Sequence, residues 1–474
     1  MTDSQRPSGD DPVAAGNTPT DAPAPDAPDD PEPSDDSPAG DADGSTAPLW
    51  TDRNFLAVWS ASTISVFGSL ITRQALPFAA ILVLSAGPLE ISAIRSAELI
   101  AALIFGLVAG AWIDRLRRRP ILIWADLGRA ILLGSIPVTA ILGLLGMPQL
   151  LLVTFAAAIL STFFDVADNA YLPTVVSRKR LVQANSALTA TGSIAEFSAF
   201  GIGGFIVQAF TAPIAIAIDA VSFVVSALLL GTIRKKEPPP KPAADREPVL
   251  REIRDGIRIT FRSPLLRALA LSHGGTHILW GIFGTGYMLF ALNELHLDPA
   301  TIGVIAAFGG VGSLAGSALA PIMVRRFGIG RAILLGIVGF TIGNALIPLA
   351  PATGAVVGIS LGALFLMGQQ LLGDALATVY EVTEVSLQQA SVGDRVLGRV
   401  NASFHTFTTL LTLFGAVLGG VLAETLGLRV AFAIGLLGAA LAFVVVWFSP
   451  VRHVREAPLV PHIGMPGDEL PIME

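Results

Sequence analysis

The stretch Gly110-Ala111-Trp112-Ile113-Asp114-Arg115-Leu116-Arg117-Arg118-Arg119-Pro120 decides how this chain is folded. It separates two apolar runs, each long enough for a helix that crosses ~30 Å of hydrocarbon at ~1.5 Å per residue. Its four arginines and one aspartate are too costly to bury in lipid. The stretch must therefore lie at a membrane surface, and its positive charge predicts that this surface is cytoplasmic.

The composition agrees with a membrane protein. The 474 residues are 52% hydrophobic and 14% charged, with a mean hydropathy of +0.67, whereas about a quarter of a soluble domain is charged. The short alternating segments of transmembrane β-strands do not occur. The chain has no cysteine, which excludes disulfides and thiolate metal sites. Residues 1–48 carry twelve acids and one arginine, a net charge of −11, so the remainder carries about +4 of the total of −7. Neither part of the chain predicts nucleic-acid binding.

Twelve apolar segments follow Phe55, and turn residues such as Gly87-Pro88 and Asp298-Pro299 separate them. We therefore predict an all-α polytopic membrane protein with twelve transmembrane helices in two six-helix bundles. The segments lie near 55–84, 90–112, 121–145, 149–172, 184–209, 212–232, 265–292, 301–323, 331–350, 354–376, 401–423 and 428–449.

Lysine and arginine residues gather after the even-numbered segments, which predicts that those loops and both termini are cytoplasmic. The richness in arginine, alanine and glycine favours a bacterial origin, and therefore the plasma (inner) membrane. The basic groups are Arg115 to Arg119, Arg178-Lys179-Arg180, Arg234-Lys235-Lys236, Arg325-Arg326, and Arg395 with Arg399.

The chain divides into five parts on these grounds. Residues 1–48 are rich in Pro, Asp and Ala and are predicted to form a disordered acidic cytoplasmic tail. Residues 52–232 and 264–450 are the two bundles, and 451–474 is a second cytoplasmic tail. The linker 233–263 contains an amphipathic helix with Leu250, Ile253, Ile257 and Phe261 on one face, which favours the membrane surface over a protein partner.

The two halves repeat each other in sequence. Ala184-Asn185-Ser186 recurs as Val400-Asn401-Ala402, and Gly203-Gly204 recurs as Gly419-Gly420, both at an offset of 216 residues. Six helices repeated in the same orientation imply a pseudo-two-fold axis along the membrane normal. Such symmetry is typical of a carrier whose two bundles rock about a central site.

The motif Gly110-x-x-x-Asp114-Arg115-x-x-Arg118-Arg119 resembles the signature loop of the major facilitator superfamily. Its C-terminal copy keeps Arg325-Arg326 but has Val324 in place of the aspartate. Other phrases resemble the efflux subgroup of macrolide and siderophore exporters, which includes enterobactin exporters. These phrases are Phe55-x-x-x-Trp59, Ala125-Asp126-Leu127-x-Arg129-Ala130, Leu172-Pro173, Asp219-Ala220-x-Ser222-Phe223 and Gly398-Arg399-Val400.

The resemblance implies a gate at the cytoplasmic side. Its members are expected to be Gly110, Asp114, Arg115 and Arg118 of the loop, with Asp165 and Asp168 near the end of the fourth helix. The arginines would bridge the carboxylates through charge-assisted hydrogen bonds when the gate closes. The alternative is that the arginines only fix the topology.

Charged residues inside apolar segments are costly and are therefore functional candidates. Arg95 and Glu98 are spaced to pair on one helix face. We expect Glu98 and Glu196 to carry protons, Arg73 to face the substrate or a counter-ion, and Asp219 either to take part in coupling or to make a hydrogen bond between helices. Three further groups are candidates. His273 and His277 are interpreted as cavity lining rather than a metal site, and Gln369, Gln370 and Asn344 as interhelical hydrogen-bonding groups. The glycines of the eighth helix, Gly309, Gly310, Gly312 and Gly316, either let it slide against the fifth helix or serve plain tight packing.

These features predict a secondary active transporter that exports a small amphipathic molecule, drug-like or siderophore-like, by proton-coupled antiport. The expected partners are the lipid bilayer and the substrate, without nucleic acid, and the protein is expected to be a monomer. No cofactor is expected beyond the proton gradient. A solute uptake carrier and a non-transporting receptor are alternatives. An enzyme is not expected, because no phosphate-binding loop, nucleophile triad or metal cluster occurs.

Overall fold

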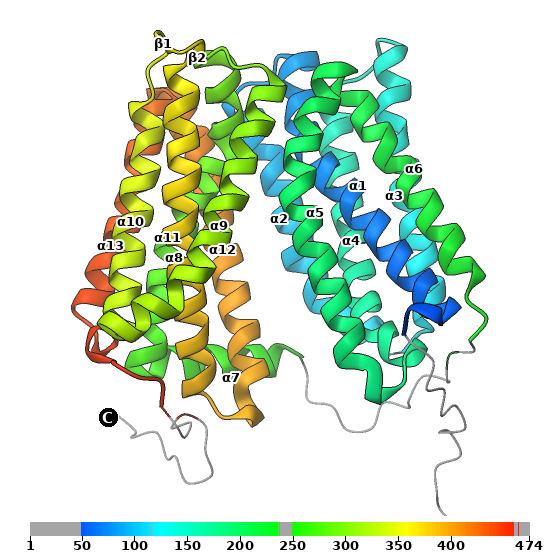
Figure 1. The fold of residues 1–474 in the computed structure, drawn as a ribbon. Helices are drawn as coiled ribbons and strands as arrows, with labels where there is room; N and C mark the ends of the chain where they lie inside the picture. The colour runs from blue at the N-terminus through cyan, green and yellow to red at the C-terminus, as the bar shows by residue number, and fades with distance from the viewer. Residues whose placement is uncertain (1–48, 114, 236, 238–248, 459–462, 464–474) are drawn as a thin grey trace, which may run out of the picture. The chain divides into compact units, whose positions relative to one another are not determined.

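The computed structural model describes residues 49–113, 115–235, 237, 249–458 and 463 (Figure 1). In this part of the chain, twelve helices have 20 or more residues, which confirms the all-α prediction. The first six are α1 (Arg53–Leu84), α2 (Pro88–Ile113), α3 (Arg118–Ile141), α4 (Met147–Val175), α5 (Leu181–Ala209) and α6 (Ala212–Thr232). The second six are α8 (Pro264–Leu289), α9 (Pro299–Phe327), α10 (Ile329–Leu349), α11 (Leu361–Ser391), α12 (Asp394–Leu426) and α13 (Leu428–Trp447).

Eight of these helices are long and apolar enough to cross a membrane, and α5 becomes a ninth when its two parts are taken as one span. The remaining long helices are α2, α8 and α11. They contain polar and charged side chains such as Arg95, His273 and Glu384. Because a charged group facing lipid is costly, these helices must turn their polar faces toward protein or water.

The two halves are built alike. In the first half α1 packs against α5 and α6, and α4 packs against α2 and α3. In the second half α8 packs against α12 and α13, and α11 packs against α9 and α10, which repeats the same pairs of neighbours (Figure 1). The repeat predicted from the sequence is therefore present in the helix packing.

The bundles have two distinguishable ends. The hairpin side carries a two-residue pair of antiparallel strands, β1 (Ala355–Val356) and β2 (Ile359–Ser360), between α10 and α11. The linker side carries α7 (Val249–Arg262), the amphipathic helix predicted in the linker (Figure 1). Part of α7 packs on α12, because Phe261 meets the edge of Phe407 at 5.4 Å between ring centroids.

The segment after α13 also lies on the linker side. It begins with a 3-10 helix, η4 (Pro450–His453), and Arg455 accepts a hydrogen bond from the backbone N–H of Ile329 at 3.2 Å. Further along, Ile463 is buried and exchanges backbone hydrogen bonds with Ser391 and Gly393. The described part of the predicted C-terminal tail is thus held against the turns that precede α10 and α12.

Two predicted segments have different bounds in the structure. Helix α11 continues to Ser391 instead of ending near 376, and α12 begins at Asp394 instead of near 401. The prediction stopped early because the intervening residues are polar. Glu384 and Gln388 are nevertheless 1% and 4% exposed, so this polar turn of helix is buried against its neighbours.

The N-terminus of α3 is capped by a residue of the linker. The Glu237 carboxylate accepts hydrogen bonds from the backbone N–H groups of Arg118 and Arg119, at 2.8 to 3.3 Å. The first N–H groups of a helix have no partner within the helix, and a carboxylate also complements the helix dipole there. This interaction was not predicted from the sequence, because Glu237 is far from α3 along the chain.

We expect Glu237→Ala to lower stability by about 1 kcal/mol, which is typical of a lost N-cap. The purified protein should therefore melt a few degrees lower at a fixed heating rate. Glu456→Ala is the matched control, since Glu456 is an exposed glutamate on the same side. Equal melting temperatures for the two variants would contradict the capping role.

Candidate functional site

The two halves meet on the hairpin side along two seams. In the first, Gly204 of α5 lies against α9, where an added Cβ would come within 2.9 Å of the Gly303 Cα. In the second, the Ser92 hydroxyl of α2 donates a hydrogen bond to the Ala416 carbonyl of α12 at 2.8 Å. Gly420 lies beside Ser92 in that seam. The closing glycine of each repeated pair therefore provides the close approach between the halves.

Several charged side chains inside the long helices are exposed. They are Arg73 on α1, Asp165 on α4, Glu196 on α5 and Glu381 on α11. Glu196 and Glu381 come from opposite halves and lie within electrostatic range of each other. Because charges on a membrane span avoid lipid, these groups face a water-accessible space between the halves.

A buried ion pair lies behind this space in the first half. Asp126 and Arg129 of α3 form a salt bridge, and the two residues are 0% and 3% exposed. The guanidinium lies between the rings of Phe164 and Phe223, at 4.3 and 4.1 Å from their centroids. The charge is thus stabilised by a carboxylate and by two aromatic faces.

Further carboxylates surround Arg129. Asp165 and Asp219 lie within electrostatic range of its guanidinium. Asp219 is fully buried and accepts a hydrogen bond from Ser222 one turn further along α6, at 3.0 Å. Asp168 accepts a hydrogen bond from Ser62 of α1 at 3.1 Å. The cluster therefore ties α1, α3, α4 and α6 together through charged and hydroxyl groups.

The predicted pair of Arg95 and Glu98 is confirmed, with 2.6 Å between the guanidinium and carboxylate atoms. Their side chains are 35% and 36% exposed. The pair lies near the hairpin side of α2, and Arg95 is also close to Gly284 of α8 in the other half. It is thus a solvated pair at the closed end of the space.

The residues predicted as a gate lie apart from one another. Asp114 is outside the described residues, and Arg115 is exposed. Arg118 binds Glu237, with 3.8 Å between the guanidinium and the carboxylate, and Arg119 donates hydrogen bonds to the Leu230 and Gly231 carbonyls. Around Gly110, no atom of the described residues lies within 4 Å of an added Cβ, apart from its chain neighbours and the adjoining helix backbone.

Asp165 and Asp168 lie deeper than the loop arginines. Asp165 precedes the end of α4 by ten residues, which is about 15 Å along a helix axis. Its charged neighbours are Arg129 and Arg73, which lie within the bundle. Among the described residues, the arginines of the α2–α3 loop therefore do not bridge these two carboxylates in this conformation. The bridge was expected only when the gate closes, so the gate stays a prediction.

A second polar cluster lies in the C-terminal half, between α8 and α11. The His273 Nδ1 is 3.4 Å from the Glu384 Oε2, and the Glu384 side chain is 1% exposed. Tyr380 shares a hydrogen bond with Ser272 at 3.2 Å. His277, whose ring centroid is 4.5 Å from that of His273, is hydrogen-bonded to Thr412 of α12.

The histidines thus contact polar groups of α11 and α12, and their role as cavity lining stays a prediction. The acidic partner of His273 was not found from the sequence. Glu384 and Glu381 lie beyond the predicted end of the tenth segment. If α11 had been predicted to continue to Ser391, both glutamates would have been placed on this helix, where Glu384 faces His273 of α8. Within the described residues, no group of three or more His, Cys, Asp or Glu side chains is arranged to hold a metal ion.

The polar and small residues of the C-terminal helices have more local roles. The Gln369 amide donates a hydrogen bond to Asn344 at 3.3 Å, which confirms the predicted interhelical interaction. The glycines of α9 at 309, 312 and 316 face Gln370, Asp374 and Ala375 of α11 rather than the fifth helix, so the structure favours the tight-packing alternative over sliding against α5. The part of α9 that contacts α5 lies nearer its start, at Pro299 and Gly303.

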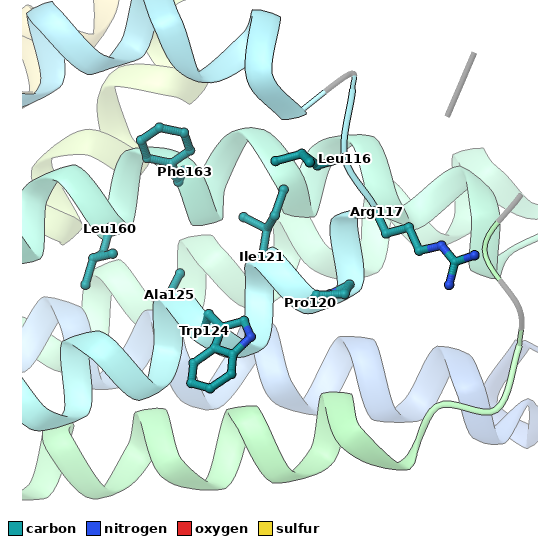
Figure 2. Close-up of a pocket in the computed structure, with 8 residues that line it drawn as sticks. All are labelled: Leu116, Arg117, Pro120, Ile121, Trp124, Ala125, Leu160 and Phe163. Carbon is teal, nitrogen blue, oxygen red and sulfur yellow. The ribbon is translucent and has the colours of Figure 1, made fainter. Parts of the chain in front are cut away.

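A lipid-facing cavity lies outside the space between the halves, beside the loop that joins α2 to α3. It has a volume of about 430 Å³ and is almost entirely apolar. Figure 2 shows Trp124 and Ile121 of α3 on one wall and Phe163 of α4 on another, with Arg117 at the rim. Trp124 is 72% exposed, which places this cavity at the bilayer rather than between the halves.

Sequence comparisons identify relatives over most of the chain. The sequence profile of the Major Facilitator Superfamily matches residues 55–392. An uncharacterized MFS-type transporter of Bacillus subtilis, YfiS, is 26% identical over 82% of this chain and 91% of its own length. The multidrug efflux pump Tap of Mycolicibacterium fortuitum is 26% identical over 85% of this chain and 97% of its own length.

Solved structures show the same fold. A bacterial homologue of the iron transporter ferroportin, 22% identical in sequence, aligns in its inward-facing state with a TM-score of 0.64 over 82% of this chain and 98% of that chain. Its outward-facing state, over the same shares of the two chains, gives a TM-score of 0.51.

Proposed function

The chain belongs to the Major Facilitator Superfamily, and we propose that it exports small amphipathic molecules in exchange for protons. It is a membrane transporter and not an enzyme. The observation that carries the proposal is the set of exposed charged side chains on long helices of both halves, of which Glu196 and Glu381 lie within electrostatic range of each other. A proton-driven carrier needs titratable groups that both sides of the membrane can reach in turn.

The direction of transport rests on orientation and on similarity. The linker side holds the basic residues 115–119, 179–180, 234–235 and 325–326, which favours the cytoplasm for this side and for both termini. With the hairpin side closed, the space opens toward the cytoplasm, where an exporter takes up its substrate. The similarity to a multidrug efflux pump over nearly its whole length supports export over uptake.

The charges also bear on the substrate. Three of the four exposed charges named above are carboxylates, and the aspartate Asp168 lies nearby on α4. Opposite charge is favoured near such groups, so the space favours a positively charged head on an apolar body. The siderophore-like substrates suggested by sequence resemblance are anionic at their binding groups and are the second choice on this ground.

Transport of ethidium, a lipophilic cation, tests the proposal. In everted membrane vesicles whose interior is more acidic by one pH unit, we expect ethidium to accumulate. Exchange of one proton for one cation allows up to about tenfold accumulation at this gradient. The matched variant is Glu196→Gln combined with Glu381→Gln, which should lose most of the accumulation because both facing carboxylates are neutral.

Three outcomes separate the alternatives. Accumulation that vanishes when nigericin collapses the pH gradient supports proton-coupled export. Accumulation in right-side-out vesicles but not in everted vesicles would indicate uptake. No ethidium movement in either orientation, at equal levels of purified and correctly folded protein, would contradict the proposed export of cationic molecules.

A further inference from the structure

The pair of His273 and Glu384 links two helices of the C-terminal half and has unmet hydrogen-bonding capacity. It joins α8 to α11 across the C-terminal half, at 3.4 Å between Nδ1 and Oε2. Neither this Nδ1 nor the second carboxylate oxygen, Oε1, has a hydrogen-bond partner among the described residues. The Glu384 carboxylate is nevertheless almost completely buried. We propose that His273 and Glu384 together form the proton-binding site of the transport cycle, which rests on the proposed function.

The energetic argument concerns net charge. Without a bound proton the pair is a neutral imidazole beside a buried carboxylate, with a net charge of −1. With one proton bound it is neutral overall, either as imidazolium with carboxylate or as imidazole with carboxylic acid. Because an uncompensated buried charge is costly, the protonated pair is the stable form when the site is closed. The deprotonated pair requires water or a cationic substrate nearby.

The neighbouring groups reinforce this difference. The charged neighbours of His273 are Glu384 and Glu381, both on α11. His277 lies one turn along α8, and its own neighbours are His273 and His405 of α12. Glu381 is exposed and lies within range of Glu196 of the other half, so the buried pair is connected to the water-accessible space through a second carboxylate. The hydroxyl of Tyr380 shares a hydrogen bond with the hydroxyl of Ser272.

Four of the other carboxylates are less suited to carry the proton. Asp126 is held in a salt bridge by Arg129, and Glu98 by Arg95, so protonation would leave an arginine without its partner. Glu196 and Glu381 are exposed, so they can exchange protons with water without a change in conformation. Only a site whose access depends on the conformation links proton movement to substrate movement.

The step involves a proton and no covalent rearrangement of the protein. When the space faces the hairpin side, one proton from water binds the pair and its charge changes from −1 to 0. When the space faces the linker side, an entering cation favours the charged form, and the proton leaves to water on that side. Substrate and proton thus compete for the same carboxylate region from opposite sides of the membrane.

Proton release by the purified full-length protein tests the site without any substrate. The protein in detergent is shifted from about pH 5 to about pH 9 in weakly buffered solution, and a pH-indicator dye reports the protons released. We expect Glu384→Gln to release about one proton fewer than the wild type. His277→Gln is the matched control on the same helix, and we expect it to release as many protons as the wild type.

A second measurement tests whether proton movement is coupled to ethidium transport. With ethidium as the probe, Glu384→Gln should lose the accumulation driven by a pH gradient of one unit, which is up to about tenfold for exchange of one proton. It should keep ethidium exchange in the absence of a gradient within about twofold. Glu384→Asp keeps a carboxylate and should recover part of the driven accumulation.

The outcomes separate this inference from the proposed function. Equal proton release by the wild type and a monodisperse Glu384→Gln protein overturns the proton site, even if ethidium is exported. Failure of the wild type to move ethidium contradicts the proposed export, while the proton-release measurement still decides the site. If Glu384→Gln does not fold, Glu384→Asp is measured instead. Reduced gradient-driven accumulation with an altered pH optimum supports the site, whereas wild-type accumulation with an unaltered pH profile overturns it.

Discussion

Replacing Arg129 by leucine is expected to lower the unfolding midpoint of the protein by about 10 °C. The change leaves Asp126 without its partner in a place where the aspartate is 0% exposed. Breaking a buried pair in this way costs about 3–5 kcal/mol, because the remaining charge has neither water nor a counter-charge. The aromatic contacts with Phe164 and Phe223 are lost as well.

The measurement is thermal unfolding of the purified protein at one fixed heating rate, since membrane proteins often unfold irreversibly. Arg95→Leu is the matched control, because Arg95 also pairs with an acid three residues away but its side chain is 35% exposed. A solvated pair of this kind contributes little, so we expect a shift of less than about 2 °C.

The double variant Arg129→Leu with Asp126→Leu distinguishes the pair from simple loss of packing. Removing both charges eliminates the uncompensated carboxylate, and buried pairs replaced by apolar residues are often neutral in stability. We expect the double variant to recover at least half of the loss. A double variant as unstable as the single one would show that Arg129 acts through something other than its charge.

Much of the architecture could be predicted from the chain because it follows from hydrocarbon thickness and charge. Twelve long helices, the repeat and the amphipathic helix α7 were all indicated by apolar runs and by the basic loops. The predicted helix bounds were wrong where a helix is polar but buried, as in the last turns of α11 around Glu384. Apolar periodicity cannot detect such turns, since their burial comes from tertiary neighbours.

The residues of the candidate site likewise divide into those that local spacing in the sequence indicates and those that it cannot indicate. Arg95 and Glu98 were found by their spacing, and the identical spacing of Asp126 and Arg129 carried the same signal, but these two residues were noted only for their family resemblance. The partners of Arg118 and His273 could not be found in this way. Glu237 and Glu384 are distant along the chain, and nothing in the local pattern specifies which distant carboxylate a basic group will meet.

Replacing Gly204 by alanine is expected to shift the protein away from the conformation that is closed on the hairpin side. A Cβ at this position would overlap the Pro299 carbonyl oxygen and come within 2.9 Å of the Gly303 Cα. Both are backbone atoms, so no side-chain rotation relieves the contact. Overpacking of this kind costs about 1–3 kcal/mol, and we expect the ratio of open to closed forms to rise about tenfold.

The other seam reports the shift, because the chain has no cysteine and a single introduced thiol reacts without background. Ser92→Cys places the thiol in the α2–α12 seam, where Ser92 is 5% exposed. If the halves move as units, Gly204→Ala should raise the labelling rate of this thiol by a membrane-impermeant maleimide about tenfold. Because Ser92 lies in the other seam, faster labelling there would show that the whole hairpin side opens. A local distortion of α5 would leave this labelling rate unchanged.

Gly201→Ala provides the matched control. It is one turn earlier on α5 and faces the same helix, but the nearest atom to an added Cβ is 3.8 Å away, at ordinary contact distance. We expect this variant to label like the background protein. A Gly204→Ala protein with unchanged labelling would mean that α5 and α9 separate without cost, and the seam would then be a consequence of closure rather than one of its determinants. A rise in both variants would instead indicate that any added side chain on this face loosens the pair, and the specific role of Gly204 would be wrong.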